Sequence, residues 1–143
     1  MTDLFDTLHA DCRQLGTQLF TLSVLDPAAG LARRAYTSHP AEYPTAGTKP
    51  MTHDGWYDHV VAAGLPFVAN TPPEFARYFF DHALITSLNL GSCMNIPVIG
   101  PAGVAGTVNL LAEAGHFTQT RQTAYLALVA AVRDALLLEM HIS

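Results

Sequence analysis

The most constraining feature of the sequence is a long uncharged stretch, residues 83–112, which contains no Asp, Glu, Lys or Arg. A stretch of this length can cross a bilayer as a helix. However, Pro97, Pro101, four glycines and three asparagines interrupt it, and lipid offers no hydrogen-bond partners to a broken helix. We therefore expect no membrane span. We interpret the stretch as the end of a helix followed by two strands that are buried on both faces.

The composition is that of a small globular protein. The chain has 143 residues, enough for one domain, and 13% of them are charged, where about 25% is typical of soluble domains. A net charge of −5 argues against binding to nucleic acid, which needs a surplus of basic residues. A hydrophobic content of 50% argues against disorder. Cys12 and Cys93 do not form a disulfide framework, and the N-terminus lacks signal-peptide features. These observations predict one cytoplasmic domain over residues 1–143.

Hydrophobic periodicity switches between helical and strand spacing along the chain. Phe5, Leu8 and Cys12 recur every three to four residues, which predicts a helix that ends near Gly16. Residues 19–26 alternate with a period of two, which predicts a strand. The other predicted helices cover residues 56–63, a segment beginning at Thr71 and residues 118–140, and the other predicted strands cover residues 31–38, 67–70, 92–99 and 104–111.

Local signals refine this pattern. Thr71 and the prolines after it start a helix that would carry Phe79 inward. Pro97 predicts an edge or a bulge in its strand, and Gly106 predicts a bulge or a close approach of backbones. Residues 39–54 have no period and form a long loop. Terminal helices around an antiparallel sheet make an α+β domain.

Two segments carry a family pattern. Residues 87–98, SLNLGSCMNIPV, combine small residues with a proline-bearing apolar run, and residues 103–111, GVAGTVNLL, form a glycine-centred strand. With the order of elements, they resemble the GAF domain family over residues 4–140. The resemblance implies a central antiparallel sheet of five to six strands with the terminal helices on one face. It also implies a small-molecule pocket under loops and short helices on the other face.

GAF domains hold cyclic nucleotides, bilins, haem or metabolites in this pocket, so the resemblance identifies neither a ligand nor a cofactor here. A GAF module is usually one part of a larger sensor. The sequence shows no catalytic or DNA-binding domain beside it, and we expect a stand-alone GAF-like protein.

The segment from the second strand into the long loop contains the first group of candidate ligand-binding residues. One hypothesis is a lid over the pocket that supplies aromatic rings, a histidine and a cation. The alternative is a rigid surface loop held by prolines. The candidates are Tyr36, Ser38, His39, Tyr43 and Lys49.

Aromatic and acidic side chains in the middle of the chain form the second group. Trp56 and Phe79 would bury the apolar part of a ligand. Asp81 and His82 either hydrogen-bond its polar groups or position a general base, or they have a structural role, in which Asp81 caps a short helix and His82 packs at its edge.

Polar side chains in the strands form the third group. Thr21 and Ser23 share one face of a strand, and Thr107 and Asn109 share one face of another. They either orient a ligand or satisfy one another. The remaining candidates, in the strand before Thr107, are Ser92, Cys93 and Asn95.

Metal and redox chemistry have weak support. His39, His53, His59 and His82 show no tight metal-ligand spacing such as HxxxH or HExxH. Cys93 lies among small residues of a core strand, where a thiol normally packs as a hydrophobe. Thiol-based reduction and bilin attachment are therefore not expected, and no metal ligand or catalytic residue is assigned.

The sequence thus predicts a sensory or regulatory domain that binds a small metabolite and forms a homodimer through its terminal helices. One alternative is a small enzyme that uses His39 or His82 with Asp81 as acid and base. A second alternative is a dimerisation module with a vestigial pocket. The identity of the ligand is not encoded in any motif found here.

Overall fold

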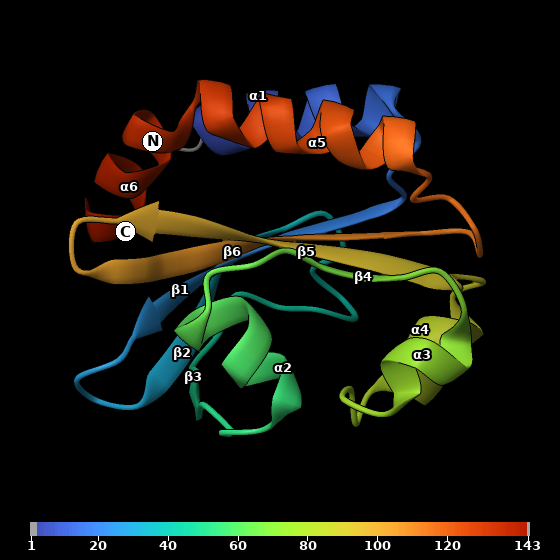
Figure 1. The fold of residues 1–143 in the computed structure, drawn as a ribbon, viewed down its shortest axis with the longest axis horizontal. Coiled ribbons are helices and arrows are strands. Elements are labelled where there is room, and N and C mark those ends of the chain that lie inside the picture. The colour runs from blue at the N-terminus through green and yellow to red at the C-terminus, as the bar shows by residue number, and fades with distance from the viewer. Residues whose placement is uncertain (1–2, 143) are drawn as a thin grey trace.

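A computed structural model describes residues 3–142 as an α+β fold built on a six-stranded antiparallel sheet (Figure 1). The strand order is β3-β2-β1-β6-β5-β4, and every neighbouring pair is antiparallel. The strands are β1 (Leu19–Asp26), β2 (Leu31–Thr37), β3 (Thr48–Pro50), β4 (Phe67–Ala69), β5 (Ser92–Gly100) and β6 (Gly103–Ala112). The uncharged stretch therefore supplies two inner strands of the sheet.

Helices cover both faces of the sheet, as the sequence predicts. The terminal helices α1 (Asp3–Gln14) and α5 (Gln119–Ala131) lie side by side over one face, and α6 (Arg133–Ile142) packs against β5 and β6 (Figure 1). The other face carries short elements: α2 (Gly55–Tyr57), the π-helical turn η1 (Asp58–Ala62), α3 (Pro72–Ala76) and α4 (His82–Ser87). Within residues 3–142, no helix is both long and apolar enough to span a membrane.

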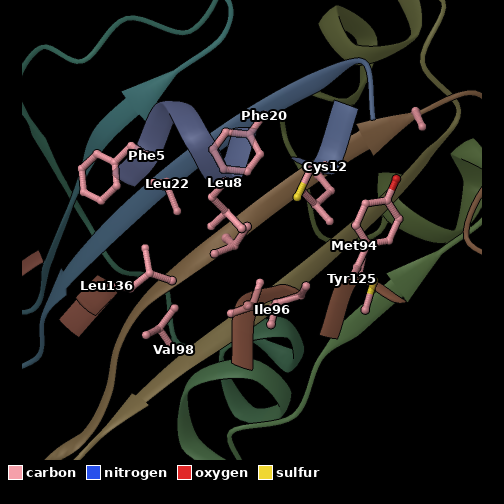
Figure 2. Close-up of a cluster of buried hydrophobic side chains, with 14 of the residues drawn as sticks. Phe5, Leu8, Cys12, Phe20, Leu22, Met94, Ile96, Val98, Tyr125 and Leu136 are labelled. Atoms are coloured by element: carbon pink, nitrogen blue, oxygen red, sulfur yellow. The ribbon is translucent and has the colours of Figure 1, made fainter. Parts of the chain in front are cut away.

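The main hydrophobic core lies between the sheet and the terminal helices (Figure 2). Phe20 and Leu22 point from β1 into this core, so the residues between them, Thr21 and Ser23, point to the opposite face. From α1 and α5, the buried residues Phe5, Leu8, Cys12, Tyr125 and Val129 cover the strands.

Pro97 and Gly106 occupy positions that suit their backbones. β4 pairs only with residues 93–95 of β5, so Pro97 faces no strand on that side and its missing N–H leaves no gap in the ladder. At Gly106, a Cβ atom would overlap the Ser23 carbonyl oxygen and lie 2.8 Å from Met140 Sδ. This is the close approach that the sequence predicts.

Two predicted helices are shorter than expected. The helix predicted over residues 118–140 is broken at Val132, where φ is −116°. The break turns α6 onto the end of the sheet, where Leu136 and Met140 become buried. The helix beginning after Thr71 ends at Ala76, and a turn separates it from α4.

The long loop also differs from the prediction. Thr48–Pro50 forms β3 and pairs with residues 31–33 of β2, so the part of the loop that carries Lys49 is fixed to the sheet edge.

Candidate functional site

A cavity of about 460 Å³ lies on the face of the sheet opposite the terminal helices. This volume is within the range of sites that hold small molecules. The sheet forms its floor. Its walls come from residues 49–57 and from residues 78–85, which comprise the turn after α3 and the start of α4.

Strand register places polar residues side by side on this floor. Thr21 of β1 is paired with Asn109 of β6, which is paired with Asn95 of β5. In the neighbouring row, Ser23 of β1 is paired with Thr107 of β6. Because side chains two positions apart in a strand share a face, these five polar residues all line the cavity.

Hydrogen bonds join four of these five residues, all but Thr107, into one chain that begins at Trp56. Trp56 Nε1 donates to Asn95 Oδ1 at 2.9 Å, and Asn95 Nδ2 donates to Asn109 Oδ1 at 2.9 Å. Asn109 Nδ2 in turn donates to Thr21 Oγ1 and Ser23 Oγ, each at 3.1 Å. The indole N–H can only donate, so Asn95 must present its oxygen to Trp56, and this fixes the direction of every later bond.

An apolar row adjoins the polar floor. Leu19, Leu111 and Cys93 are paired across β1, β6 and β5, and Phe79 and Ile85 pack near them from the opposite wall. Burial raises the pKa of the Cys93 thiol to about 12. At neutral pH this group is a neutral thiol, which is a poor nucleophile and acts as part of the apolar wall.

Arg34 enters the cavity from β2. A β-bulge between Leu22 and Ser23 pairs Leu22 with Tyr36 but Ser23 with Arg34, so that Ala35 is the extra residue. Arg34 Nη1 donates to the Pro44 carbonyl oxygen at 2.8 Å. Its Nε is buried and has no hydrogen-bond partner among residues 3–142.

The aromatic ring of Tyr43 connects Arg34 to an acidic residue. The Arg34 guanidinium lies 5.0 Å from the centre of the Tyr43 ring, and Tyr43 Oη donates to Asp81 Oδ2 at 2.6 Å. Burial, followed by this hydrogen bond, raises the pKa of Tyr43 above its usual value. The phenol therefore stays protonated and holds the Asp81 carboxylate.

The other charged residues at the cavity are Asp54 and Lys49. Asp54 Oδ1 accepts the Tyr57 N–H at 2.9 Å and so caps α2. Lys49 Nζ lies 5.8 Å from the centre of the Phe80 ring, which is 89% exposed at the cavity mouth.

Eight of the thirteen candidate ligand-binding residues line the cavity and five do not. The eight are Tyr43, Lys49, Trp56, Phe79, Asp81, Cys93, Asn95 and Asn109. The five outside it are Tyr36, Ser38, His39, His82 and Ser92.

Local geometry explains these five positions. Tyr36 points to the helix-covered face, where its hydroxyl donates to Asp6 and lies 2.9 Å from His9 Nδ1. Ser38 Oγ accepts the Phe20 N–H and lies 2.6 Å from His39 Nδ1, so this pair is tied to the end of β2. His82 is exposed at the start of α4, and Ser92 Oγ donates to the Glu113 carbonyl oxygen.

Metal-binding and histidine chemistry find no support in this geometry. In residues 3–142, no group of three His, Cys, Asp or Glu side chains is arranged to hold a metal ion. The lining residues of the cavity include no histidine, so neither His39 nor His82 faces the cavity together with Asp81.

Sequence reasoning missed Arg34 and several wall residues. It assigned no role to Arg34, because the direction of this side chain depends on a bulge in the pairing of β1 and β2, and this bulge leaves no signal in the sequence. The missed wall residues are Met51, Thr52, Asp54, Tyr57, Tyr78 and Phe80.

Comparisons with known proteins identify the fold. No protein-family model and no curated protein matches the chain. Solved structures do match. The GAF domain of a two-component sensor histidine kinase from Bacillus halodurans has a TM-score of 0.74 at 11% identity, covering 99% of this chain and 93% of that one. A GAF domain/HD domain protein from Geobacter sulfurreducens has a TM-score of 0.75 at 12% identity, covering 97% and 93%.

An enzyme shares the same architecture. A type II free methionine-R-sulfoxide reductase from Thermoplasma acidophilum has a TM-score of 0.62 at 14% identity, covering 95% of this chain and 90% of that one. The chain therefore has the GAF fold, as its sequence pattern suggests. At these identities the likeness defines the fold and not the activity.

Proposed function

We propose that the protein is a sensory or regulatory domain that binds a small organic molecule in the cavity over the sheet. The observation that carries this proposal is the polar floor. Two asparagines and three hydroxyl residues face an open volume of about 460 Å³, and Thr21, Asn95 and Thr107 among them are buried. Buried polar groups are costly unless they are bonded, and a ligand is the natural partner for those that face a cavity.

The structural neighbours support a sensory role. One of them is a GAF domain of a sensor histidine kinase, in which a GAF domain is part of a signalling protein. We therefore favour binding over catalysis. The acid–base alternative rested on His39 and His82, and neither side chain lines the cavity.

Native mass spectrometry of gently purified protein tests the proposal directly. The expected result is a non-covalent adduct of small mass, released on denaturation. Ala32 lines the cavity, so Ala32→Leu should fill part of it and reduce the adduct. Ala28 is exposed in the turn between β1 and β2, so Ala28→Leu is a matched control that should retain the adduct.

Fluorescence provides a second test on the same protein. Trp56 is the single tryptophan of the chain and lines the cavity, so its emission should change when a metabolite binds. A protein that carries no adduct and shows no Trp56 response to a metabolite panel would contradict the proposed function.

We also propose that the domain forms a homodimer through α5. Between Arg121 and Arg133 this helix carries no charge, and Leu126, 37% exposed, lies on its outer surface beside Ala127 and Ala130. Leu126→Asp should convert a dimer to a monomer in light scattering. A monomeric parent protein would refute the dimer.

A cytoplasmic location is part of the same proposal. Both cysteines, Cys12 and Cys93, are free and buried. Free thiols of this kind are common in proteins of the reducing cytoplasm.

A further inference from the structure

Arg34 is a cation without a counter-ion at the cavity. It forms no ion pair with any described residue, and its one hydrogen bond runs from Nη1 to the Pro44 carbonyl oxygen. The edge of the guanidinium formed by Nε and Nη2 is the edge that binds two oxygens side by side. In this structure Nε and Nη2 have no hydrogen-bond partner among the described residues, and Nε is covered by protein, so a ligand oxygen reaches this edge after a shift of the Arg34 side chain.

Two hydroxyl groups of the neighbouring cavity floor also have protons that they do not donate. Thr21 and Ser23 accept hydrogen bonds from Asn109, so their own hydroxyl protons remain to be donated. Neither hydroxyl donates to another described residue. Ser23 is paired across the strands with Arg34, so both kinds of donor lie in the same part of the cavity.

Both carboxylates that line the cavity already accept a hydrogen bond from another residue. Asp81 accepts the Tyr43 hydroxyl and Asp54 accepts the Tyr57 N–H. Lys49 is a second cation on the cavity wall, near the mouth beside Phe80. Two cations and two carboxylates line the cavity, so its positive charge is local to Arg34 and Lys49. Arg34 and the hydroxyls beside it offer donors, whereas the aromatic residues Trp56 and Phe79 offer flat apolar surface.

We propose that the cavity binds a small organic carboxylate with a planar body. Its two carboxylate oxygens are held by the Nε and Nη2 edge of Arg34 and by the hydroxyl protons of Ser23 and Thr21. Its ring lies toward Trp56 and Phe79. This inference rests on the proposed function, because it specifies the class of ligand that the same cavity takes.

A carboxylate fits better than a phosphate. One arginine edge and two hydroxyls match the planar pair of oxygens of a carboxylate. A phosphate dianion has three oxygens and a larger charge, whereas Lys49 is the one other cation among the lining residues of the cavity.

The test uses pairs of probes of nearly equal shape, of which one is a carboxylate anion and the other a neutral amide. Benzoate is compared with benzamide, and 3-phenylpropanoate with 3-phenylpropanamide, by Trp56 fluorescence and by thermal shift. Each acid should bind about tenfold to a hundredfold more tightly than its amide, which is the usual worth of a charge-assisted pair. Phenyl phosphate should bind more weakly than benzoate.

Adjacent arginines supply a matched pair of variants. Arg34→Gln should reduce the affinity for the acid to that for the amide. Arg34→Lys should restore part of it, because a lysine keeps the charge but not the two-point edge. Arg33→Gln removes the same charge from the opposite face of β2 and should leave the preference intact.

The outcomes separate this inference from the proposed function. Equal binding of acids and amides, tighter binding of phenyl phosphate, or an unchanged preference in Arg34→Gln would overturn the carboxylate site. Absence of binding by either acid at millimolar concentration would also overturn it. In each case a native adduct that Ala32→Leu removes would leave the proposed function standing.

Discussion

The hydrogen bond between Asn95 and Asn109 gives a quantitative test of the cavity floor. Asn109 makes three side-chain bonds and Asn95 makes two, and they share the bond from Asn95 Nδ2 to Asn109 Oδ1. Asn95→Ala or Asn109→Ala removes this bond and leaves one partner without its contact. Each change should lower the free energy of unfolding by about 1–3 kcal/mol.

The double variant should lose less free energy of unfolding than the two single variants lose together. Both single changes break the same bond, and the double change leaves neither amide orphaned, so the coupling should be about 0.5–1.5 kcal/mol. Asn95 is 6% exposed and should show the larger single effect, because water reaches it least. Urea unfolding followed by circular dichroism is the appropriate assay, since Trp56 emission itself changes when Asn95 is lost.

Additivity would refute this reasoning. If the single effects add to within about 0.3–0.5 kcal/mol, the shared bond contributes nothing to stability. Asn109→Ala combined with Thr7→Ala is the control cycle, because Thr7 is exposed on α1, on the other side of the sheet. That pair should be additive.

Three further predictions follow from other parts of the fold. Gly106→Ala should destabilise the protein by about 1–3 kcal/mol in urea unfolding, because the new Cβ meets the Ser23 carbonyl oxygen and Met140; an unchanged midpoint would contradict the packing described. Both cysteine thiols, with pKa values raised to about 12 by burial, should resist a thiol reagent in the native protein and react in denaturant, and rapid native labelling would count against their burial. Burial, with the nearby Arg121, lowers the pKa of His116 below 6.5 in the folded protein. The unfolded chain therefore binds the proton more tightly, and the free energy of unfolding should fall as the pH drops through 6.5. His116→Gln should show a shallower fall, and an identical pH profile would exclude this histidine as the cause.

Most of the fold was predictable because its signals are local. The alternation of residues 19–26 fixed which residues of β1 face the helices, and that choice placed Thr21 and Ser23 on the cavity face. Gly106 and Pro97 also predicted their surroundings, because a glycine within a strand marks a bulge or a close approach of backbones and a proline cannot donate to the ladder. The break at Val132 was not predictable, since the residues around it have good helical periodicity and the bend depends on packing against the sheet.

The candidate site was predictable only in part. The floor followed from strand alternation, and Tyr43, Trp56 and Phe79 are aromatic residues in segments that cover it. His39 lies in a loop, whose sequence does not encode the direction of its side chains, and Tyr36 lies in β2, where the bulge turns it to the opposite face from Arg34. Arg34 was missed because its direction depends on a bulge, which is a property of how two strands pair and not of either strand alone.

The bulge at Ala35 decides which of two adjacent arginines faces the cavity. With Ala35 paired in a regular ladder, Arg34 would turn toward the helices and Arg33 would take its neighbour's place on the cavity face. With Ala35 deleted, Arg34 would keep its direction in a regular strand. Because residues 33 and 34 are both arginine, the cavity side of β2 presents an arginine with or without the bulge, so the cation of this wall tolerates insertion or deletion of one residue at position 35.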